Sequence, residues 1–174
     1  MKILICGQAG HGKDEVAKYI TDLTDLSYAS SSQFALDLFL LERLNEIGLT
    51  YSSASAAYAD RVNHRPIWHR LISEYNEGNR ARLATALCNI HDIYVGMRCI
   101  KELEACNQIK LFDLIIWVDA SMRKGITEGT DSIQVESRHC DIILENNTTK
   151  SELFYKTCRL VTALGLVDRP VRSS

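Results

Sequence analysis

The chain has 174 residues, of which 46% are apolar and 24% charged, so it is long enough for one well-packed domain but short for two. Its net charge of −2 argues against a protein that coats nucleic acid, because such proteins normally carry a strong basic surplus. A local basic pocket for one nucleotide or a short strand is compatible with this charge. No apolar run reaches the roughly 20 residues of a membrane helix.

The N-terminal segment is a short apolar run that ends at a glycine. Ile3–Cys6, followed by Gly7, predicts a buried strand rather than a signal peptide, so we expect a cytoplasmic protein. The six cysteines form no CxxC pair, and the five histidines are not spaced to complete a zinc site with them. We therefore expect reduced thiols and no structural metal.

Strands and helices alternate along the rest of the chain. Apolar residues at helical spacing predict a helix over residues 13–23. Three serines, at 30–32, can cap the next helix. The later elements are expected in this order: a strand near 26–29, a helix from 33 to about 47, helices within 54–89 with a break at 77–79, a strand at 93–95, a helix at 99–108, strands at 114–118 and 142–144, and a helix at 151–164.

This alternation predicts one three-layer α/β domain over residues 1–174, with about five parallel strands between helices. No repeat, low-complexity tract or Pro/Gly-rich linker divides the chain. The segment 54–89 is expected to be a helical insert that covers an acceptor, with Pro66 in the first turn of one helix. Ligands of such sheets bind beyond the carboxyl ends of the strands, where the motifs of this chain fall.

The sequence GQAGHGKD at residues 7–14 lies between the first strand and the first helix. It fits the GxxxxGK pattern in the context that the pattern requires. Glycines let backbone N–H groups face one anion, the helix adds its dipole, and Lys13 supplies a charge for the β- and γ-phosphates. We expect a phosphate loop for ATP, with Lys13 facing solvent before nucleotide binds and His11 only spacing the turn. The predicted nucleotide-binding residues are Gly7, Gln8, Ala9, Gly10, His11, Gly12, Lys13, Asp14 and Glu15.

The residue after the lysine is Asp14, where most phosphate loops have a Ser or Thr that ligates Mg²⁺. A carboxylate can bind this ion directly or through water. GKD at this point resembles the deoxynucleoside monophosphate kinases of tailed bacteriophages. The resemblance implies a P-loop kinase that uses ATP and Mg²⁺ and acts in the host cytoplasm.

The resemblance extends to three later segments. DIYVGMR at 92–98 is similar to the family's strand that ends in an arginine, and FDLIIWVDAS at 112–121 to the next strand, which precedes a lid arginine. CDIILENNT at 140–148 is similar to the last strand and adenine-side loop shared with dephospho-coenzyme-A kinases. The resemblance implies catalytic roles for Arg98 and Arg123 and nucleotide binding by Asn146. The alternative to a catalytic Arg98 is a surface arginine that pairs with Glu102 on the next helical turn. The alternative to a catalytic Arg123 is a solvated surface charge.

One position departs from the larger phage kinases, which usually have an Asp before the arginine where this chain has Gly96. The candidate metal-binding acids are therefore Asp14 and Asp119. The short chain and its DIYVGMR and WVDAS segments resemble a group of short phage kinases. Some of these phosphorylate the hydroxymethyl group of 5-hydroxymethyluracil in phage DNA, a step toward hypermodified thymine.

Two acceptor chemistries remain open at the sequence level. A hydroxyl acceptor needs a general base, a role that the resemblance to hydroxyl kinases gives to Asp37, although an exposed helical Asp is the alternative. A phosphate acceptor needs no base and is held by arginines, for which the insert offers Arg61 and Arg65. Trp68 is either a platform that stacks on a base or a core residue.

The preferred hypothesis is a kinase of 5-hydroxymethyluracil in DNA, with Lys13, Asp37, Arg98 and Arg123 in catalysis and Arg61, Arg65, Trp68 and Arg98 in acceptor binding. The first alternative is a kinase of free deoxynucleoside monophosphates. The second is a nucleotide-binding protein without turnover, for which Gly96 is the support. The sequence leaves the oligomeric state open.

Overall fold

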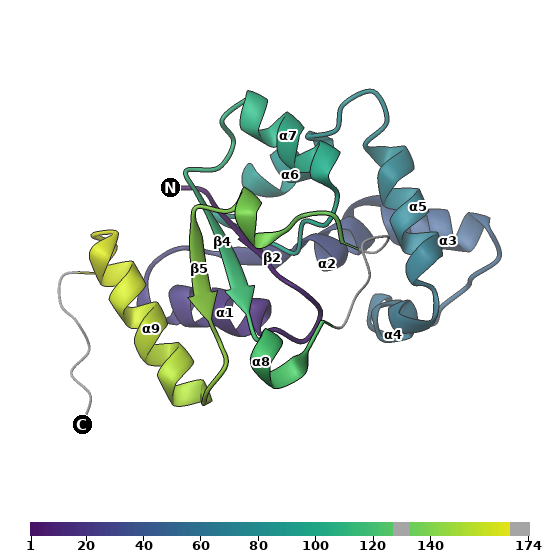
Figure 1. Cartoon of the computed structure of the whole chain (residues 1–174). Coiled ribbons are helices and arrows are strands. Elements are labelled where there is room, and N and C mark those ends of the chain that lie inside the picture. The colour runs from purple at the N-terminus through teal and green to yellow at the C-terminus, as the bar shows by residue number, and fades with distance from the viewer. Residues whose placement is uncertain (127–132, 168–174) are drawn as a thin grey trace.

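Five parallel strands form one sheet in the order β2-β3-β1-β4-β5 (Figure 1). The computed structural model describes residues 1–126 and 133–167. The strands are β1 (Ile3–Cys6), β2 (Tyr28–Ser30), β3 (Ile93–Val95), β4 (Leu114–Asp119) and β5 (Ile142–Glu145). In the register, Ile3 of the central strand lies opposite Ile93 on one side and Leu114 on the other. The expected sheet of about five parallel strands is confirmed, and its middle strand leads into the phosphate loop.

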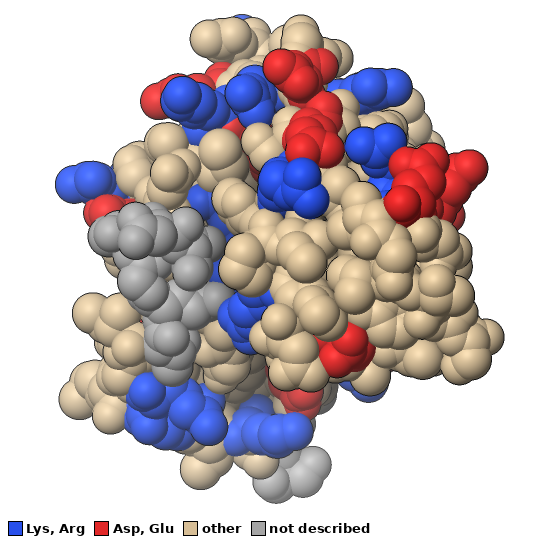
Figure 2. All heavy atoms as spheres, turned by 90° about the vertical axis from the view of Figure 1, so that its right-hand side faces the viewer, with Lys and Arg blue, Asp and Glu red and all other residues tan. Residues whose placement is uncertain are grey.

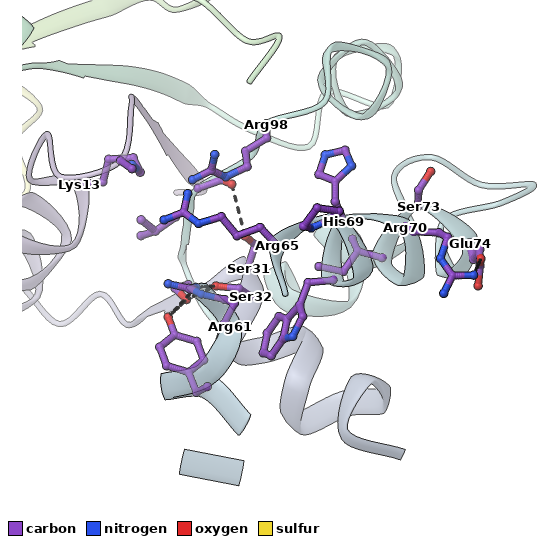
Figure 3. Close-up of a pocket in the computed structure, with 18 of the residues that line it drawn as sticks. Lys13, Ser31, Ser32, Arg61, Arg65, His69, Arg70, Ser73, Glu74 and Arg98 are labelled. Atoms are coloured by element: carbon purple, nitrogen blue, oxygen red, sulfur yellow. Dashed lines mark hydrogen bonds and ion pairs between the residues drawn. The ribbon is translucent and has the colours of Figure 1, made fainter. Parts of the chain in front are cut away.

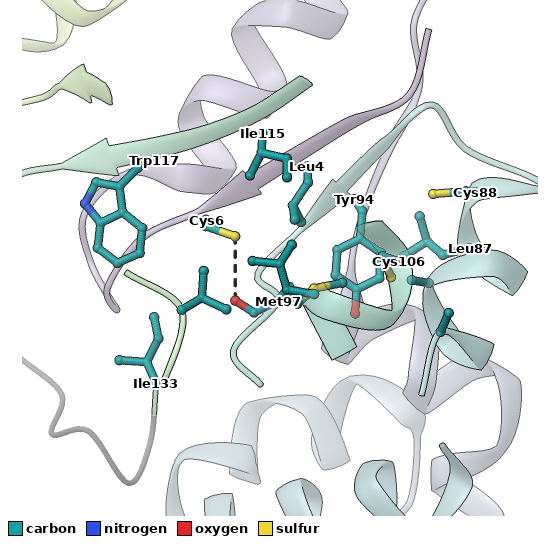
Figure 4. Packing of buried hydrophobic residues seen from close by; sticks show 14 residues of the cluster. Leu4, Cys6, Leu87, Cys88, Tyr94, Met97, Cys106, Ile115, Trp117 and Ile133 are labelled. Carbon is teal, nitrogen blue, oxygen red and sulfur yellow. Dashed lines mark hydrogen bonds between the residues drawn. The ribbon is translucent and has the colours of Figure 1, made fainter. Parts of the chain in front are cut away.

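Helices cover both faces of this sheet, as Figure 1 shows. Ile3 and Ile5 belong to the hydrophobic cluster on one face, together with α1 (Lys13–Leu23) and α9 (Lys150–Ala163). Leu4 and Cys6 alternate to the other face, where α6 (Arg82–Cys88) and α7 (Ile100–Gln108) pack. Figure 4 shows this second cluster, with Leu4 and Tyr94 close to residues of α6 and α7. Burial on both faces explains why the strands are apolar without interruption.

A third cluster fills a helical unit to the right of the sheet in Figure 1. Its buried residues are Leu36, Leu40, Leu44, Ala57, Trp68 and Leu71. The elements that supply them are a π-helical turn η1 (Leu36–Leu40), α3 (Leu41–Glu46), α4 (Ala54–Asp60) and α5 (Arg65–Tyr75). Helix α2 (Ser31–Ala35) leads into η1, and a 3₁₀ turn η2 (Arg61–Asn63) follows α4.

The segment expected as one insert, residues 54–89, therefore divides between two cores. Its first two helices, α4 and α5, pack with η1 and α3, whereas Ala84 and Leu87 of α6 pack against the sheet. Two short elements complete the described part of the chain, α8 (Ser121–Lys124) and a 3₁₀ turn η3 (Ser137–His139). Within residues 1–126 and 133–167, none of the helices has the length and apolar character to cross a membrane.

A buried carboxylate joins the helical unit to the sheet layer. Glu102 of α7 is only 8% exposed, and its Oε1 accepts a hydrogen bond of 2.8 Å from the side chain of Asn76, which follows α5. The Asn76 Oδ1 in turn accepts from the Leu83 backbone N–H at 3.0 Å. Burial raises the pKa of the Glu102 carboxyl, and the Asn76 bond opposes this shift only in part.

Replacing Glu102 with glutamine is expected to stabilise the protein increasingly as the pH rises. A carboxyl whose folded pKa is raised favours folding below its ordinary pKa, about 4.3, and loses that contribution as the pH passes the folded value. Glutamine can still accept from Asn76 and does not ionise. Urea unfolding of both proteins from pH 4.5 to 8 should show a widening gap in unfolding free energy. Glu104→Gln, an exposed site on the same helix, is the control. A difference in unfolding free energy between Glu102→Gln and the wild-type protein that stays constant with pH would contradict this interpretation.

Candidate active site

The phosphate loop connects β1 to α1, as the sequence predicts. Gly12, the residue before α1, has a φ of 95°, and a Cβ atom there would lie 2.5 Å from the side-chain nitrogen of Asn146. Only glycine permits this close approach. The same Asn146 nitrogen donates to the His11 carbonyl at 2.9 Å, and Asn146 is 5% exposed. Asn146, predicted to bind nucleotide, thus holds the loop against the end of β5.

Lys13 is buried, with 8% exposure, although we expected it to face solvent. Its Nζ donates a hydrogen bond of 2.7 Å to the carbonyl oxygen of Gln8, the second residue of the loop. The reason is that a buried ammonium needs hydrogen-bond acceptors, and the curled loop provides one. The side chain therefore lies across the loop that the β- and γ-phosphates would enter, which is the position that its expected role requires.

The two acids after Lys13 have different surroundings. Asp14 is exposed and lines the cavity described below. Glu15 accepts hydrogen bonds from Tyr19 at 2.7 Å and from Lys150 of α9 at 3.3 Å. The Tyr19 bond lowers the pKa of Glu15, while burial and this bond raise the pKa of Tyr19 to about 12. Glu15, predicted to bind nucleotide, is not among the cavity residues and instead joins α1 to α9.

A cavity of about 920 Å³ opens beside Lys13 (Figure 3). Its walls come from the phosphate loop and the start of α1, the β2–α2 junction, α4 to α5, and the residues after β3. In the space-filling view, Lys and Arg side chains lie along the hollow that runs down this face of the molecule (Figure 2). The cavity lies at the carboxyl ends of β1, β2 and β3, where ligands of open α/β sheets bind.

Arg61 lines this cavity in a fixed position. Its guanidinium stacks over the Tyr58 ring at 4.3 Å, and it donates to the Tyr58 hydroxyl at 3.1 Å. It also donates to the hydroxyl of Ser32. Tyr58 is in turn 3.3 Å from the hydroxyl of Ser30. These contacts connect α4 to the β2–α2 junction and aim the guanidinium at the cavity (Figure 3).

Arg65 and Arg98 line the cavity from two further elements. Arg65 is the exposed first residue of α5, and Arg98 is half-buried just past β3. Figure 3 shows both side chains extending toward the Lys13 end of the cavity. Glu102, the alternative partner of Arg98, is bonded to Asn76 instead. The structure thus brings together Lys13, Arg61, Arg65 and Arg98, which the sequence selected at four separate places.

Asp37, the predicted general base, does not line this cavity. It lies exposed on the π-helical turn η1, where both carboxylate oxygens accept from the Gln33 side chain at 3.1 and 3.2 Å. The carboxylates that do line the cavity are Asp14, Glu74 and Glu77. The placement of Asp37 therefore gives no support to its role as base.

Trp68 lines the cavity but is only 3% exposed. Its ring meets that of Tyr58 edge-on, with centroids 6.3 Å apart, inside the cluster formed by Leu40 and Leu71. A stacking platform must expose a ring face, so the structure favours the alternative reading of Trp68 as a core residue. The sequence signal for that reading was the helical spacing of Trp68 and Tyr75.

On the opposite side of the phosphate loop, Asp119 and Arg123 support short helix α8. Asp119 accepts from the Ser121 backbone N–H at 3.2 Å and from its hydroxyl at 3.0 Å, and Asn147 donates to it at 3.4 Å. Its carboxylate is thus already engaged in capping α8. Arg123 is exposed, and its Nε donates to the Asn146 carbonyl at 3.3 Å. Arg123 is not among the residues that line the cavity.

Comparison with known proteins places the fold. No protein-family model matches the chain, and no curated protein matches its sequence. Among solved structures, dephospho-CoA kinase from Campylobacter jejuni superposes with a TM-score of 0.50 and 11% identity, over 94% of this chain and 98% of that one. The chain has the fold of the P-loop kinases. Identity this low shows the fold alone, because one fold hosts many functions.

Two further P-loop kinase structures align over nearly the whole chain. Shikimate kinase from Aquifex aeolicus VF5 has a TM-score of 0.48 and 11% identity, and the alignment covers 95% of this chain and 99% of that one. A sugar kinase from Janibacter sp. HTCC2649 has a TM-score of 0.46 and 18% identity, with 95% and 94% covered. These alignments span the full length of each partner almost completely.

Sequence reasoning missed part of this candidate site. The serines at 30–32 were assigned to helix capping, and Ser30 does accept from the Gln33 N–H at 3.2 Å. They also form a wall of the cavity, where Ser31 donates to the Gly96 carbonyl at 3.4 Å. His69 and Arg80 line the cavity as well and were not selected. The available signal was the position of the serines at the carboxyl end of a strand.

Proposed function

We propose that this protein is an ATP-dependent kinase with a deoxynucleotide-type acceptor. The observation that carries the proposal is one cavity with Lys13 of the phosphate loop at one end and three arginines, Arg61, Arg65 and Arg98, on the other walls. Cations that converge from separate elements favour an anionic ligand. A γ-phosphoryl group at Lys13 and an acceptor at the arginines would share this cavity, and transfer then depends on positioning and charge neutralisation.

Mg²⁺ would be held mainly through the nucleotide. Within residues 1–126 and 133–167, no three His, Cys, Asp or Glu side chains are grouped to hold a metal ion. Mg²⁺ commonly uses one or two carboxylates together with phosphates and waters, so a single acid fits. Asp14 is exposed next to Lys13 and lines the cavity, whereas Asp119 is engaged with Ser121 and Asn147. Asp14 is therefore the proposed ligand, and the ion would neutralise charge on the transferred phosphoryl group.

The preferred acceptor is a phosphate, as in a free deoxynucleoside monophosphate. A hydroxyl acceptor needs a base close to the attacking oxygen, and Asp37 lies outside the cavity. A phosphate acceptor is already anionic and needs charge-assisted donors, which Arg61 and Arg65 offer. The position of Asp37 thus reverses the order of the two acceptors that the sequence favoured.

The 5-hydroxymethyl group of 5-hydroxymethyluracil in DNA remains the second candidate, and one observation favours it. The cavity does not end at the arginine cluster but continues along α5 to Glu77 and Arg80. Neighbouring nucleotides of a strand would find room there, with Arg61 and Arg65 on backbone phosphates.

A labelling experiment separates these candidates. γ-Labelled ATP is offered with each deoxynucleoside monophosphate, with DNA that contains 5-hydroxymethyluracil, and with matched thymine DNA. We expect label in free nucleoside diphosphates and none in either DNA. Label in the hydroxymethylated DNA alone would establish the second candidate. Nucleotide binding without transfer to any acceptor would contradict the kinase proposal and leave a binding protein.

Variants test which residues hold the acceptor. Arg65→Ala is expected to raise the acceptor KM about 10-fold or more, because a charge-assisted hydrogen bond contributes roughly 1.5 to 3 kcal/mol. Its ATP KM should change less than about 2-fold, since Lys13 and the loop hold the nucleotide. Arg159→Ala, an equal charge change on the exposed side of α9, is the control. Asp37→Asn should leave turnover unchanged; a loss of about 10² or more would restore Asp37 as general base.

A further inference from the structure

His11 of the phosphate loop uses both ring nitrogens in hydrogen bonds. The residue is 2% exposed. The Ala120 backbone N–H donates to Nδ1 at 3.0 Å, and Nε2 lies 3.1 Å from the Gly125 carbonyl oxygen. A backbone amide can only donate and a carbonyl can only accept, so in these two contacts Nδ1 is the acceptor and Nε2 the donor. The expectation that His11 only spaces the turn is therefore wrong.

The two partners of His11 flank a single element. Ala120 precedes helix α8 and Gly125 follows it, so the imidazole joins both ends of this helix to the phosphate loop. We call this pair of hydrogen bonds the His11 clasp. A spacer residue would not need these contacts, since burying an unpartnered imidazole is unfavourable and any small side chain fills a turn. The clasp also satisfies the Ala120 N–H at the start of α8.

Helix α8 carries Arg123, and a second path returns from that residue to the loop. The Arg123 Nε donates to the Asn146 carbonyl at 3.3 Å, and the Asn146 side chain donates to the His11 carbonyl at 2.9 Å. The phosphate loop, α8 and the end of β5 thus form a closed ring of hydrogen bonds. A displacement of His11 must shift α8, because the helix has only four residues and both of its ends are held by this side chain.

We propose that His11 is a positioning residue that fixes the position of Arg123 relative to the phosphate loop. The inference rests on the proposed phosphoryl transfer, in which a cationic side chain beside the loop stabilises charge on the transferred group. His11 does not touch the reacting atoms itself. It fixes the short helix that carries Arg123, for which the family resemblance implies a role at the transferred group, and its expected contribution is therefore to turnover and not to nucleotide affinity.

Three substitutions separate the two bonds of the clasp. His11→Phe keeps the ring volume and removes both hydrogen bonds. His11→Asn can still place an acceptor near the Nδ1 position, and His11→Gln can still place a donor near the Nε2 position. We expect His11→Phe to lower kcat about 10- to 100-fold, the scale of a small misplacement, with ADP affinity and acceptor KM within about 2-fold. His11→Asn and His11→Gln should each recover part of this loss. Melting temperatures establish that every variant is folded.

A double-mutant cycle with Arg123→Ala gives the decisive readout. If His11 acts through Arg123, His11→Phe should change kcat less than about 2-fold once Arg123 is alanine. Three results would overturn the proposal: additive losses in the double variant, an ADP affinity that falls as much as kcat, or an Arg123→Ala variant with full turnover.

Amide exchange tests the clasp without any turnover. The Ala120 N–H should exchange slowly in the wild-type protein and faster in His11→Phe, while exchange in α1 stays the same. A protein that binds ADP but phosphorylates no acceptor would contradict the kinase proposal. The exchange rate of the Ala120 N–H would still test the His11 clasp, because this measurement does not depend on turnover. Equal exchange in both proteins would refute the clasp.

Discussion

Replacing Lys13 with methionine is expected to lower the rate of phosphoryl transfer about 10²- to 10³-fold, the range found when one preorganised donor is removed from a charge-stabilising site. The ammonium is 8% exposed, and its hydrogen bond to the Gln8 carbonyl keeps it at the loop before nucleotide binds. Little rearrangement is then needed for it to meet a phosphate. The measurement is single-turnover transfer from γ-labelled ATP at saturating nucleotide.

Methionine is chosen because it keeps most of the buried aliphatic stem and removes the charge. The melting temperature should therefore stay near that of the wild-type protein, since the cost of burying an ammonium offsets most of what its hydrogen bond to the Gln8 carbonyl contributes. Lys18→Met, an exposed substitution one turn further along α1, is the matched control and should leave turnover unchanged. A folded Lys13→Met protein with normal turnover would refute the assigned role.

Replacing Gly7 with alanine is expected to reduce the free energy of unfolding by roughly 3 kcal/mol, because strain and overpacking add at this position. Gly7 has a φ of 142°, which side chains rarely adopt, and its Cβ would lie 2.5 Å from the carbonyl oxygen of Val118. That oxygen belongs to the backbone of β4, so it can move only if the central strands separate. Urea unfolding at equilibrium measures the loss.

Gly10→Ala in the same loop measures the conformational cost of a positive φ without the steric contact that the added Cβ makes at Gly7. Its φ is 75°, and no heavy atom lies within 4 Å of the added Cβ, so only the conformational cost of about 1 kcal/mol is expected. Equal losses at the two positions would show that the contact with Val118 relaxes freely. A larger loss at Gly7 would show that the close approach of loop and β4 is rigid.

The sheet and the phosphate loop were predictable because their signals are local. The runs that form β1, β3 and β4 are apolar and bounded by turn residues, and burial on both faces leaves no other reading for them. The loop follows from glycines and Lys13 at a fixed spacing between a strand and a helix. Arg98 was predicted from the end of a strand, and Arg61 and Arg65 from the basic character of the helical insert; the topology brings all three to one cavity.

The remaining features depend on contacts between distant parts of the chain. The His11 clasp joins residues more than 100 positions apart, and no local pattern indicates such a pair. Asp37 was placed on an ordinary helix, but it lies in a π-helical turn, which changes the direction of the side chains that follow. The division of segment 54–89 between two cores follows from which apolar faces meet, and this is decided by tertiary packing.

The contacts of Arg61 have a consequence for the entropy of ligand binding. A free arginine side chain loses up to about 2 kcal/mol of rotamer entropy when it is ordered, and a ligand that orders it must supply that free energy. Tyr58 and Ser32 already restrict this side chain before any acceptor arrives. This entropy is thus lost during folding. An incoming anion gains the charge interaction with a smaller entropic penalty, because the guanidinium is already ordered when the anion arrives.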